Sequence, residues 1–253
     1  MPRQARTKSN TGIYHVVMRG INQQRIFEDH LDYRKFLDTI GLYKDKSGYE
    51  LYAYCLMGNH IHLLIREGDE DLGNAFRRIG AAYVYWYNWK YNRCGHLFQD
   101  RFKSEAVETD AYLLTVLRYI HQNPLKAGMV KKTEEYQWSS YHEYVGKAEL
   151  CDTEYALKAF SEERPLALNR FQKFHLKVGA DNCLEYSDKR LNDTEAAEVI
   201  CRLTGDSSPQ SLQRSGKEER SRIIQELRQN KLSIRQIQRL TGISIGVIRG
   251  AGS

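Results

Sequence analysis

The chain has 253 residues, of which 41% are hydrophobic and 28% charged, and its formal net charge is +6. This length suffices for one large domain, or for a core domain with a smaller appendage, without disulfide or metal support. No apolar stretch approaches the length of a transmembrane helix, and none follows the basic N-terminus, so we expect a soluble, unexported protein. The five cysteines are widely spaced and form no C-x-x-C pair, which argues against a disulfide framework or a cysteine zinc site.

Basic residues concentrate at both ends of the chain. Between Gln210 and Ser253 nine Lys and Arg residues stand against three Asp and Glu, and the first ten residues carry basic residues but no acidic one. Basic ends on a globular body are typical of proteins that contact phosphates. A solvated basic face would have the same composition, so charge alone leaves both interpretations open.

The first half of the chain alternates between strand-like and helix-like patterns. The predicted elements are a strand at residues 13–18, an amphipathic helix at 29–46, two hairpin strands within 49–66 on either side of Gly58-Asn59, a helix at 71–91, a strand near the end of 94–108, and a helix at 111–122 that Asp110 caps and Asn123-Pro124 ends.

This order of elements predicts an α+β fold. It is the order of a ferredoxin-like, RRM-like antiparallel sheet with helices covering one face. The other face would be free for a ligand.

The second hairpin strand begins with the motif His60-Ile61-His62. Residues two apart on a strand share a face, so both imidazoles are expected to reach one small volume. Neutral imidazoles on a rigid strand form half of a divalent metal site. In the alternative, one histidine packs and the other caps a loop; for His15, in the first strand, a packed or cross-strand role is expected.

The helix at 111–122 offers groups that could complete this site. Tyr112, Tyr119 and Asn123 share one helical face, since Tyr119 and Asn123 differ by about 40° in heading. A phenol can act as a nucleophile, and an amide oxygen suits Mg²⁺ or Mn²⁺. A metal held by His60, His62 and Asn123 would keep open positions and could polarise a phosphodiester. Tyr112 is expected to be a core aromatic, which is also the alternative for Tyr119.

Four ordered blocks of sequence resemble one known family. The blocks GIYHVVMRG, LMGNHIHLL, GHLFQDRFKS and YLLTVLRYIHQNPLKAGMV, spanning about residues 13–145, resemble the single-tyrosine HUH transposases, above all their REP-associated branch (RAYTs). The resemblance implies that His60, His62 and Asn123 bind the metal and that Tyr119 is the nucleophile. It also implies cleavage of single-stranded DNA beside hairpin repeats through a 5′-phosphotyrosine intermediate, by a monomer or a homodimer in the bacterial cytoplasm, associated with the nucleoid.

The remaining residues lie beyond these blocks. Residues 147–193 mix short apolar clusters with acidic residues and predict a helical connector. Helices are predicted at 194–203 and 217–229, and residues 230–249 resemble a helix-turn-helix in which Ser233 caps, Gly242 turns and Ser244 begins the second helix. An ordinary αα-hairpin would show the same apolar spacing, but the surplus of basic residues favours binding to double-stranded DNA.

We therefore expect a catalytic domain at 1–146, a helical connector at 147–193 and a helix-turn-helix domain at 194–253. The expected DNA contacts are basic residues in the N-terminal arm, the blocks, the aromatic helix and the C-terminal helices: Arg3, Arg6, Arg19, Arg77, Arg78, Arg101, Lys103, Arg235, Arg239 and Arg249. The alternative function is a non-catalytic nucleic-acid-binding regulator with an RRM-like sheet. His-Ile-His in place of RNP aromatics on an inner strand favours the enzyme.

Overall fold

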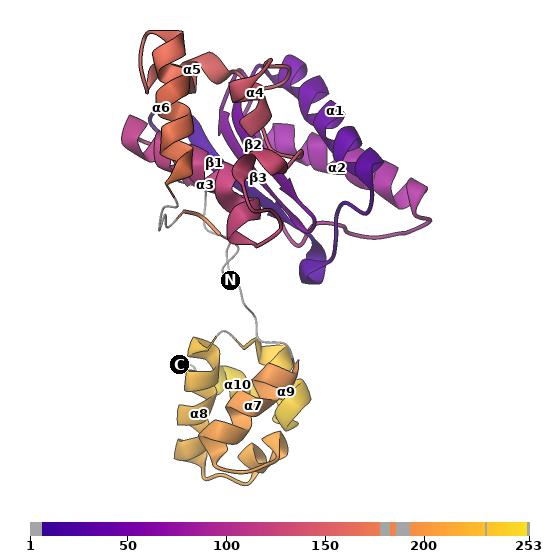
Figure 1. Cartoon of the computed structure of the whole chain (residues 1–253). Coiled ribbons are helices and arrows are strands. Elements are labelled where there is room, and N and C mark those ends of the chain that lie inside the picture. The colour runs from indigo at the N-terminus through magenta and orange to yellow at the C-terminus, as the bar shows by residue number, and fades with distance from the viewer. Residues whose placement is uncertain (1–6, 178–182, 186–192, 231, 252–253) are drawn as a thin grey trace. The chain divides into compact units, whose positions relative to one another are not determined.

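A computed structural model describes residues 7–177, 183–185, 193–230 and 232–251 (Figure 1). The chain divides into two compact units, Met1–Glu185 and Tyr186–Ser253, which are described separately. Arg3 and Arg6 of the expected basic arm lie outside the described residues. Within the described part of the chain, no helix combines the length and apolar character needed to cross a membrane.

The first unit is built on a four-stranded sheet in the order β2-β3-β1-β4. Its strands are β1 (Ile13–Arg19), β2 (Glu50–Met57), β3 (His60–Arg66) and β4 (Lys103–Ala106), and every neighbouring pair is antiparallel. Met57 pairs with His60, so Gly58 and Asn59 form a two-residue turn. The predicted hairpin and the predicted antiparallel sheet are therefore confirmed.

Helices α1 (His30–Ser47) and α2 (Leu72–Lys90) pack together on one face of the sheet. Asp29 caps α1 by accepting from the amides of Leu31 and Asp32, and Gly48 ends it in the left-handed region at φ 67°. The apolar sides of both helices and of the strands form one core, which includes Val16, Phe36, Ile40, Leu56, Leu63, Phe76, Ile79 and Tyr83.

The prediction that helices cover only one face of the sheet is wrong. Helix α3 (Asp110–Lys126) packs on the opposite face, against β2 and β3 (Figure 1). Every residue of β2 from Leu51 to Met57 is buried, so this strand is apolar on both sides and needs cover on both. The histidines thus face a packed helix.

Both ends of α3 also differ from the prediction. Thr109, whose side chain accepts from the amide of Tyr112, is the N-cap in place of Asp110. The helix continues through Pro124 to Lys126. A proline in the last turn keeps a helical φ and removes only one backbone hydrogen bond, so it does not end the helix here.

Residues after 146 contribute to the core of the first unit. Helices α5 (Thr153–Lys158) and α6 (Arg164–Leu176) join α3 and the preceding helix α4 (Tyr141–Val145) in a second apolar cluster. The rings of Tyr144 and Phe171 stack at 4.7 Å, which ties α6 to α4. Short 3-10 turns at Ile21–Gln23 (η1) and Thr133–Glu135 (η2) complete the unit.

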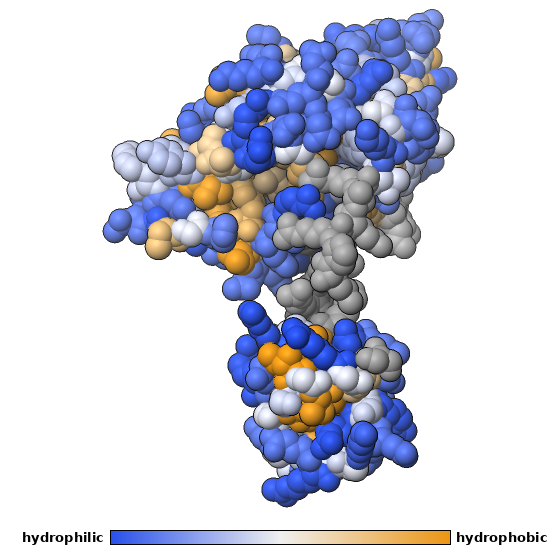
Figure 2. All heavy atoms as spheres, turned by 180° about the vertical axis from the view of Figure 1, so that it is seen from behind, coloured by the Kyte–Doolittle hydropathy of each residue, from blue (hydrophilic) through white to orange (hydrophobic). Residues whose placement is uncertain are grey.

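The second unit is all helical where the structure describes it. It comprises α7 (Asp193–Thr204), the 3-10 turn η3 (Pro209–Gln213), α8 (Lys217–Gln229), α9 (Ile234–Thr241) and α10 (Ile245–Gly250). Ser233 and Ser244 cap α9 and α10, and Gly242 turns between them at φ 76°, as predicted. Figure 2 shows apolar side chains gathered on one face of this unit, surrounded by hydrophilic ones.

Candidate active site

Three histidines lie on the sheet face that α3 covers. His62 is buried between Val17 of β1 and Cys55 of β2, and His60 pairs with Arg19 at the end of the same strands. The ring centroids of His60 and His62 are 5.0 Å apart, so the strand brings both imidazoles together, as predicted. His15, fully buried on β1, stacks on His62 at 5.3 Å.

Tyr119 of α3 meets these imidazoles from the facing helix. Its ring centroid lies 5.7 Å from that of His62 and 5.8 Å from that of His15, and only 2% of the residue is exposed. Its hydroxyl donates to Glu185 Oε1 at 2.5 Å, and Lys126 Nζ lies 4.7 Å from its ring centroid. A phenol, three imidazoles, a carboxylate and an ammonium therefore converge in one place.

Asn123, one turn after Tyr119, lies close enough to interact with both His60 and Tyr119. Its side chain raises the pKa of His60 and lowers that of Tyr119, although burial outweighs both effects. Its Nδ2 is buried and has no hydrogen-bond partner among the described residues. A buried amide nitrogen without a partner can donate to the acceptor of a bound group.

The protonation states follow from burial. Burial lowers the pKa of His60 to about 4 and that of His62 well below its usual range, so both rings are neutral at pH 7. Burial, and then the hydrogen bond to Glu185, raise the pKa of Tyr119 above its ordinary value. The imidazoles are thus in the form that binds a metal ion, whereas the phenol keeps its proton until a base or a cation assists it.

The ligating side chains of this site fit a divalent metal ion. Two neutral imidazoles and one amide oxygen are ordinary ligands for such an ion and leave coordination positions open. His60 is prepared for this role, because its Nδ1 donates to Asn59 Oδ1 at 2.7 Å and leaves Nε2 with a lone pair. Among the described residues, no group of three or more His, Cys, Asp or Glu side chains could hold a metal.

Two further residues of the site were not predicted as functional. Glu185 lies 66 positions after Tyr119, and no local pattern connects the two. Lys126 is one of many surface lysines in the sequence, although it stands seven residues after Tyr119 and therefore on the same side of α3.

The basic residues expected to bind DNA lie in different places. Arg19 and Lys103 lie on the site face, since Arg19 pairs with His60 and Lys103 pairs with Val17, the neighbour of His62. The charge of Arg19 also lowers the pKa of His60, which places it near that ring. These two residues are the predicted cations that the sheet brings to the site.

Other predicted cations of the first unit lie elsewhere. Arg77 and Arg78 are on α2, which packs on the opposite face of the sheet. Arg78 bonds to Ser47 and Glu70 and lies over the ring of Tyr43, whereas Arg77 is exposed. Arg101 lines a hollow of about 410 Å³ whose other lining side chains include Glu67, Asp69, Glu70 and Asp71, a surface that disfavours phosphate.

In the second unit, Arg235, Arg239 and Arg249 are exposed on α9 and α10. Arg239 forms an ion pair with Asp193 through contacts of 2.9 and 2.5 Å. The carboxylate raises the pKa of the Arg239 guanidinium.

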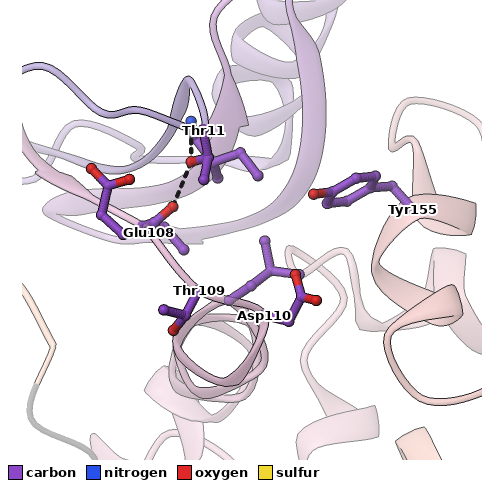
Figure 3. A pocket seen from close by; sticks show the side chains of 8 residues that line it. Thr11, Glu108, Thr109, Asp110 and Tyr155 are labelled. Carbon is purple, nitrogen blue, oxygen red and sulfur yellow. Dashed lines mark hydrogen bonds between the residues drawn. The ribbon is translucent and has the colours of Figure 1, made fainter.

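A separate hollow of about 230 Å³ lies where β1 begins and α3 starts (Figure 3). Thr11, Glu108, Thr109, Asp110 and Tyr155 line it, and the Thr11 hydroxyl donates to the carbonyl of Val107 at 2.6 Å. None of the predicted site residues lines this hollow. Its two carboxylates make it unsuited to a nucleic-acid backbone.

Part of the chain is similar to known proteins. Residues 8–123 match the family described as "Transposase IS200 like". A REP-associated tyrosine transposase of Escherichia coli (strain K12) is 24% identical over 144 residues, which cover 55% of this chain and 81% of that protein. A putative REP-associated tyrosine transposase of Haemophilus influenzae is 32% identical over 114 residues, covering 40% of this chain and 64% of that protein.

Among solved structures, a REP-associated tyrosine transposase bound to a REP hairpin is similar in fold. It has a TM-score of 0.50 and 23% sequence identity, and the match covers 58% of this chain and 87% of that one. The family match contains the three histidines and Tyr119 and ends at Asn123. Glu185 and the second unit lie outside it.

Proposed function

We propose that the chain is a metal-dependent endonuclease and strand transferase acting on single-stranded DNA, with Tyr119 as nucleophile. The match of residues 8–123 to the IS200-like transposase family and the similarity to a REP-associated tyrosine transposase support this proposal. The observation that carries the proposal is the approach of the Tyr119 ring to His62 at 5.7 Å, with Asn123 beside both His60 and Tyr119. Segments far apart in sequence supply these groups.

His60, His62 and Asn123 would hold the divalent ion, Mg²⁺ or Mn²⁺. When bound, the ion supplies positive charge that polarises the phosphodiester and stabilises the leaving 3′ oxygen. Arg19 lies on the same face and adds a fixed cation for the DNA backbone. The neutral state of both imidazoles at pH 7 supports this assignment.

Tyr119 forms a bond from its phenol oxygen to phosphorus while the bond to the 3′ oxygen breaks. The phenol proton passes to the Glu185 carboxylate, which already accepts it at 2.5 Å, and the leaving 3′ oxygen takes a proton from water. Lys126, over the ring, stabilises the negative charge that develops on the phenol oxygen. The product is a 5′-phosphotyrosine, which conserves the phosphodiester energy and permits rejoining to another strand.

The proposed substrate is single-stranded DNA that folds into hairpin repeats, by extension from a relative whose solved structure holds a REP hairpin. All the proposed groups, from His60 to Glu185, belong to one chain. The proposed enzyme acts as a monomer or as a homodimer. The action on DNA further suggests a protein of the bacterial cytoplasm, associated with the nucleoid.

We also propose that the first unit is a ferredoxin-like catalytic domain and that the second unit contains a DNA-binding helix-turn-helix. The sequence of elements from β1 to β4, with the order β2-β3-β1-β4, supports the ferredoxin-like description of a catalytic domain. Helices α9 and α10 around Gly242 support a helix-turn-helix that binds double-stranded DNA. Because Arg239 is paired with Asp193, Arg235 and Arg249 are the better candidates for DNA contacts.

Salt dependence tests this second DNA-binding role. Replacing Arg235 and Arg249 together by Gln should weaken duplex binding and reduce the slope of log K against log salt by about 1.8, because each lost phosphate contact contributes about 0.9. The matched control is Arg222→Gln, at an exposed arginine on α8. An unchanged slope in the double variant would refute a DNA-binding role for α9 and α10.

The central test is formation of a covalent adduct. The full chain is incubated with Mg²⁺ or Mn²⁺ and labelled single-stranded DNA from the flanks of its own gene, then resolved on a denaturing gel. A metal-dependent band, with the nucleotide mapped to Tyr119 by mass spectrometry, is expected. DNA binding without an adduct under either metal would instead favour the non-catalytic regulator.

A further inference from the structure

His15 is the third histidine on the site face and has no role in the proposed cleavage. It is fully buried on β1, and its Nε2 lies 3.0 Å from His62 Nδ1. Its own Nδ1 is buried and has no hydrogen-bond partner among the described residues. Its one side-chain hydrogen bond in the described structure is therefore directed at a proposed metal ligand.

The hydrogen shared by His15 and His62 can sit on either ring. If His62 Nδ1 carries it, neutral His15 accepts at Nε2 and carries its own hydrogen on Nδ1, and His62 Nε2 keeps a lone pair for a metal ion. If His15 Nε2 carries it, neutral His62 must be protonated at Nε2 and cannot bind a metal through that atom. The tautomer of His62 therefore decides whether the site can be loaded.

His60 has the corresponding arrangement with a different partner. Its Nδ1 donates to Asn59 Oδ1, and the Asn59 amide is oriented by its Nδ2, which donates to the carbonyl of Gln23 at 3.3 Å. The lone pair of His60 is thus fixed on Nε2 by a neighbour at Nδ1. Among the described residues, His15 forms the hydrogen bond with His62 Nδ1, and so it occupies the equivalent place.

We propose that His15 is a positioning residue for metal binding, which accepts the Nδ1 hydrogen of His62 and so holds that ring with Nε2 free. The proposal rests on the proposed function, in which His62 is a ligand. His15 acts through His62, because its Nε2 is occupied by that ring and it is fully buried. Groups that orient a ligating imidazole in this way commonly contribute 10- to 100-fold to metal affinity.

Two substitutions of His15 distinguish its role as a hydrogen-bond acceptor from its role in filling space. His15→Gln places an amide oxygen near the position of Nε2 and keeps an acceptor, whereas His15→Leu fills the space without one. Mn²⁺ affinity of the full chain, measured by electron paramagnetic resonance without DNA, should fall about 10- to 100-fold in His15→Leu and by no more than about threefold in His15→Gln.

A second buried imidazole pair provides the matched control. His121 Nδ1 and His175 Nε2 are also 3.0 Å apart, but His175 lies on α6 and contacts no proposed ligand in the described structure. His175→Leu removes a buried histidine pair of the same length and should leave Mn²⁺ affinity unchanged. Equal losses in His15→Leu and His175→Leu would show a general effect of packing and overturn the proposal.

The tautomer itself can be read if His15→Leu fails to fold. Nitrogen-15 spectra of the histidine rings in the wild-type chain with Mg²⁺ should show His62 protonated at Nδ1, and protonation at Nε2 would overturn the proposal. Wild-type protein that binds no Mn²⁺ would refute the metal-dependent function itself. Normal Mn²⁺ binding in both wild type and His15→Leu would refute only the role of His15.

Discussion

Replacing Tyr119 by Phe removes one oxygen atom from the site and leaves its ring in place. The ring contacts with His15 and His62, at 5.8 and 5.7 Å, and the approach of Lys126 are retained. The hydrogen bond to Glu185 is lost. Bonds to charged groups contribute about 1.5–3 kcal/mol, but Glu185 is exposed and regains water, so we expect a loss of about 1 kcal/mol and a fall in Tm of about 2–4 °C.

The effect on chemistry should be far larger than this effect on stability. Without the phenol oxygen no phosphotyrosine can form, and adduct formation should fall more than about 10⁴-fold, below detection on a denaturing gel. Affinity for a hairpin, measured by fluorescence anisotropy, should remain within about twofold. The assay therefore separates loss of the nucleophile from loss of the fold or of DNA binding.

Tyr112→Phe is the matched control on the same helix. Tyr112 also donates to a glutamate, Glu105, at 2.6 Å, so this variant loses a similar hydrogen bond from another part of α3. It should keep the adduct. A persistent adduct in Tyr119→Phe, or its loss in Tyr112→Phe alone, would refute the assignment of the nucleophile.

Three other predictions concern the neighbouring groups. His60→Ala should lower cleavage at least about 100-fold while hairpin affinity in EDTA stays unchanged; equal losses of both would assign His60 to DNA binding. Glu185→Gln should slow single-turnover adduct formation about 10²-fold or more, because the amide cannot take the phenol proton. A faster reaction would show instead that the carboxylate restrains Tyr119. Stability should fall as pH drops below about 6.5. Burial lowers the pKa of His15 to about 3 and that of His175 to about 4, so below pH 6.5 the unfolded chain binds more protons than the folded one. Urea midpoints at pH 7.5, 6 and 5 measure this effect, and a midpoint that does not change with pH would contradict it.

Tryptophan fluorescence can assign that pH dependence to one unit. All three tryptophans and all eight histidines precede residue 186. A fluorescence-detected transition therefore reports the unit that contains the titrating groups. A transition seen only by circular dichroism would report the second unit, which has no histidine and should lack this dependence on pH.

Local periodicity was enough to predict the elements and the shared faces of their residues. His60 and His62 are two apart on a strand, and Tyr119 and Asn123 are four apart on a helix, so each pair follows from the repeat of one element. The turn at Gly58-Asn59 sets the register of β2 against β3. The proximity of the two pairs, in contrast, depends on how α3 packs on the sheet, which the spacing of residues within either element does not contain.

The features that were predicted wrongly or missed all depend on contacts between segments that are distant in the sequence. The continuous burial of β2 requires cover on both faces, but a short apolar run of this kind can be satisfied by a helix from any part of the chain. The pairing of β1 with β3 decides that His15 meets His62, and a shift by one residue would turn it to the other face. Glu185 reaches Tyr119 across 66 positions.

The predicted site residues and the newly identified ones differ in the range of their interactions. His60, His62, Tyr119 and Asn123 are the groups that would touch the metal or the phosphate, and they lie in compact motifs within residues 8–123. His15 depends on strand register, and Glu185 lies outside the family match. If Glu185 accepts the phenol proton as proposed, part of the chemistry of this chain belongs to a segment that the family motif does not specify. Chains with the same motif can therefore share the nucleophile and still differ in the rate of the first step.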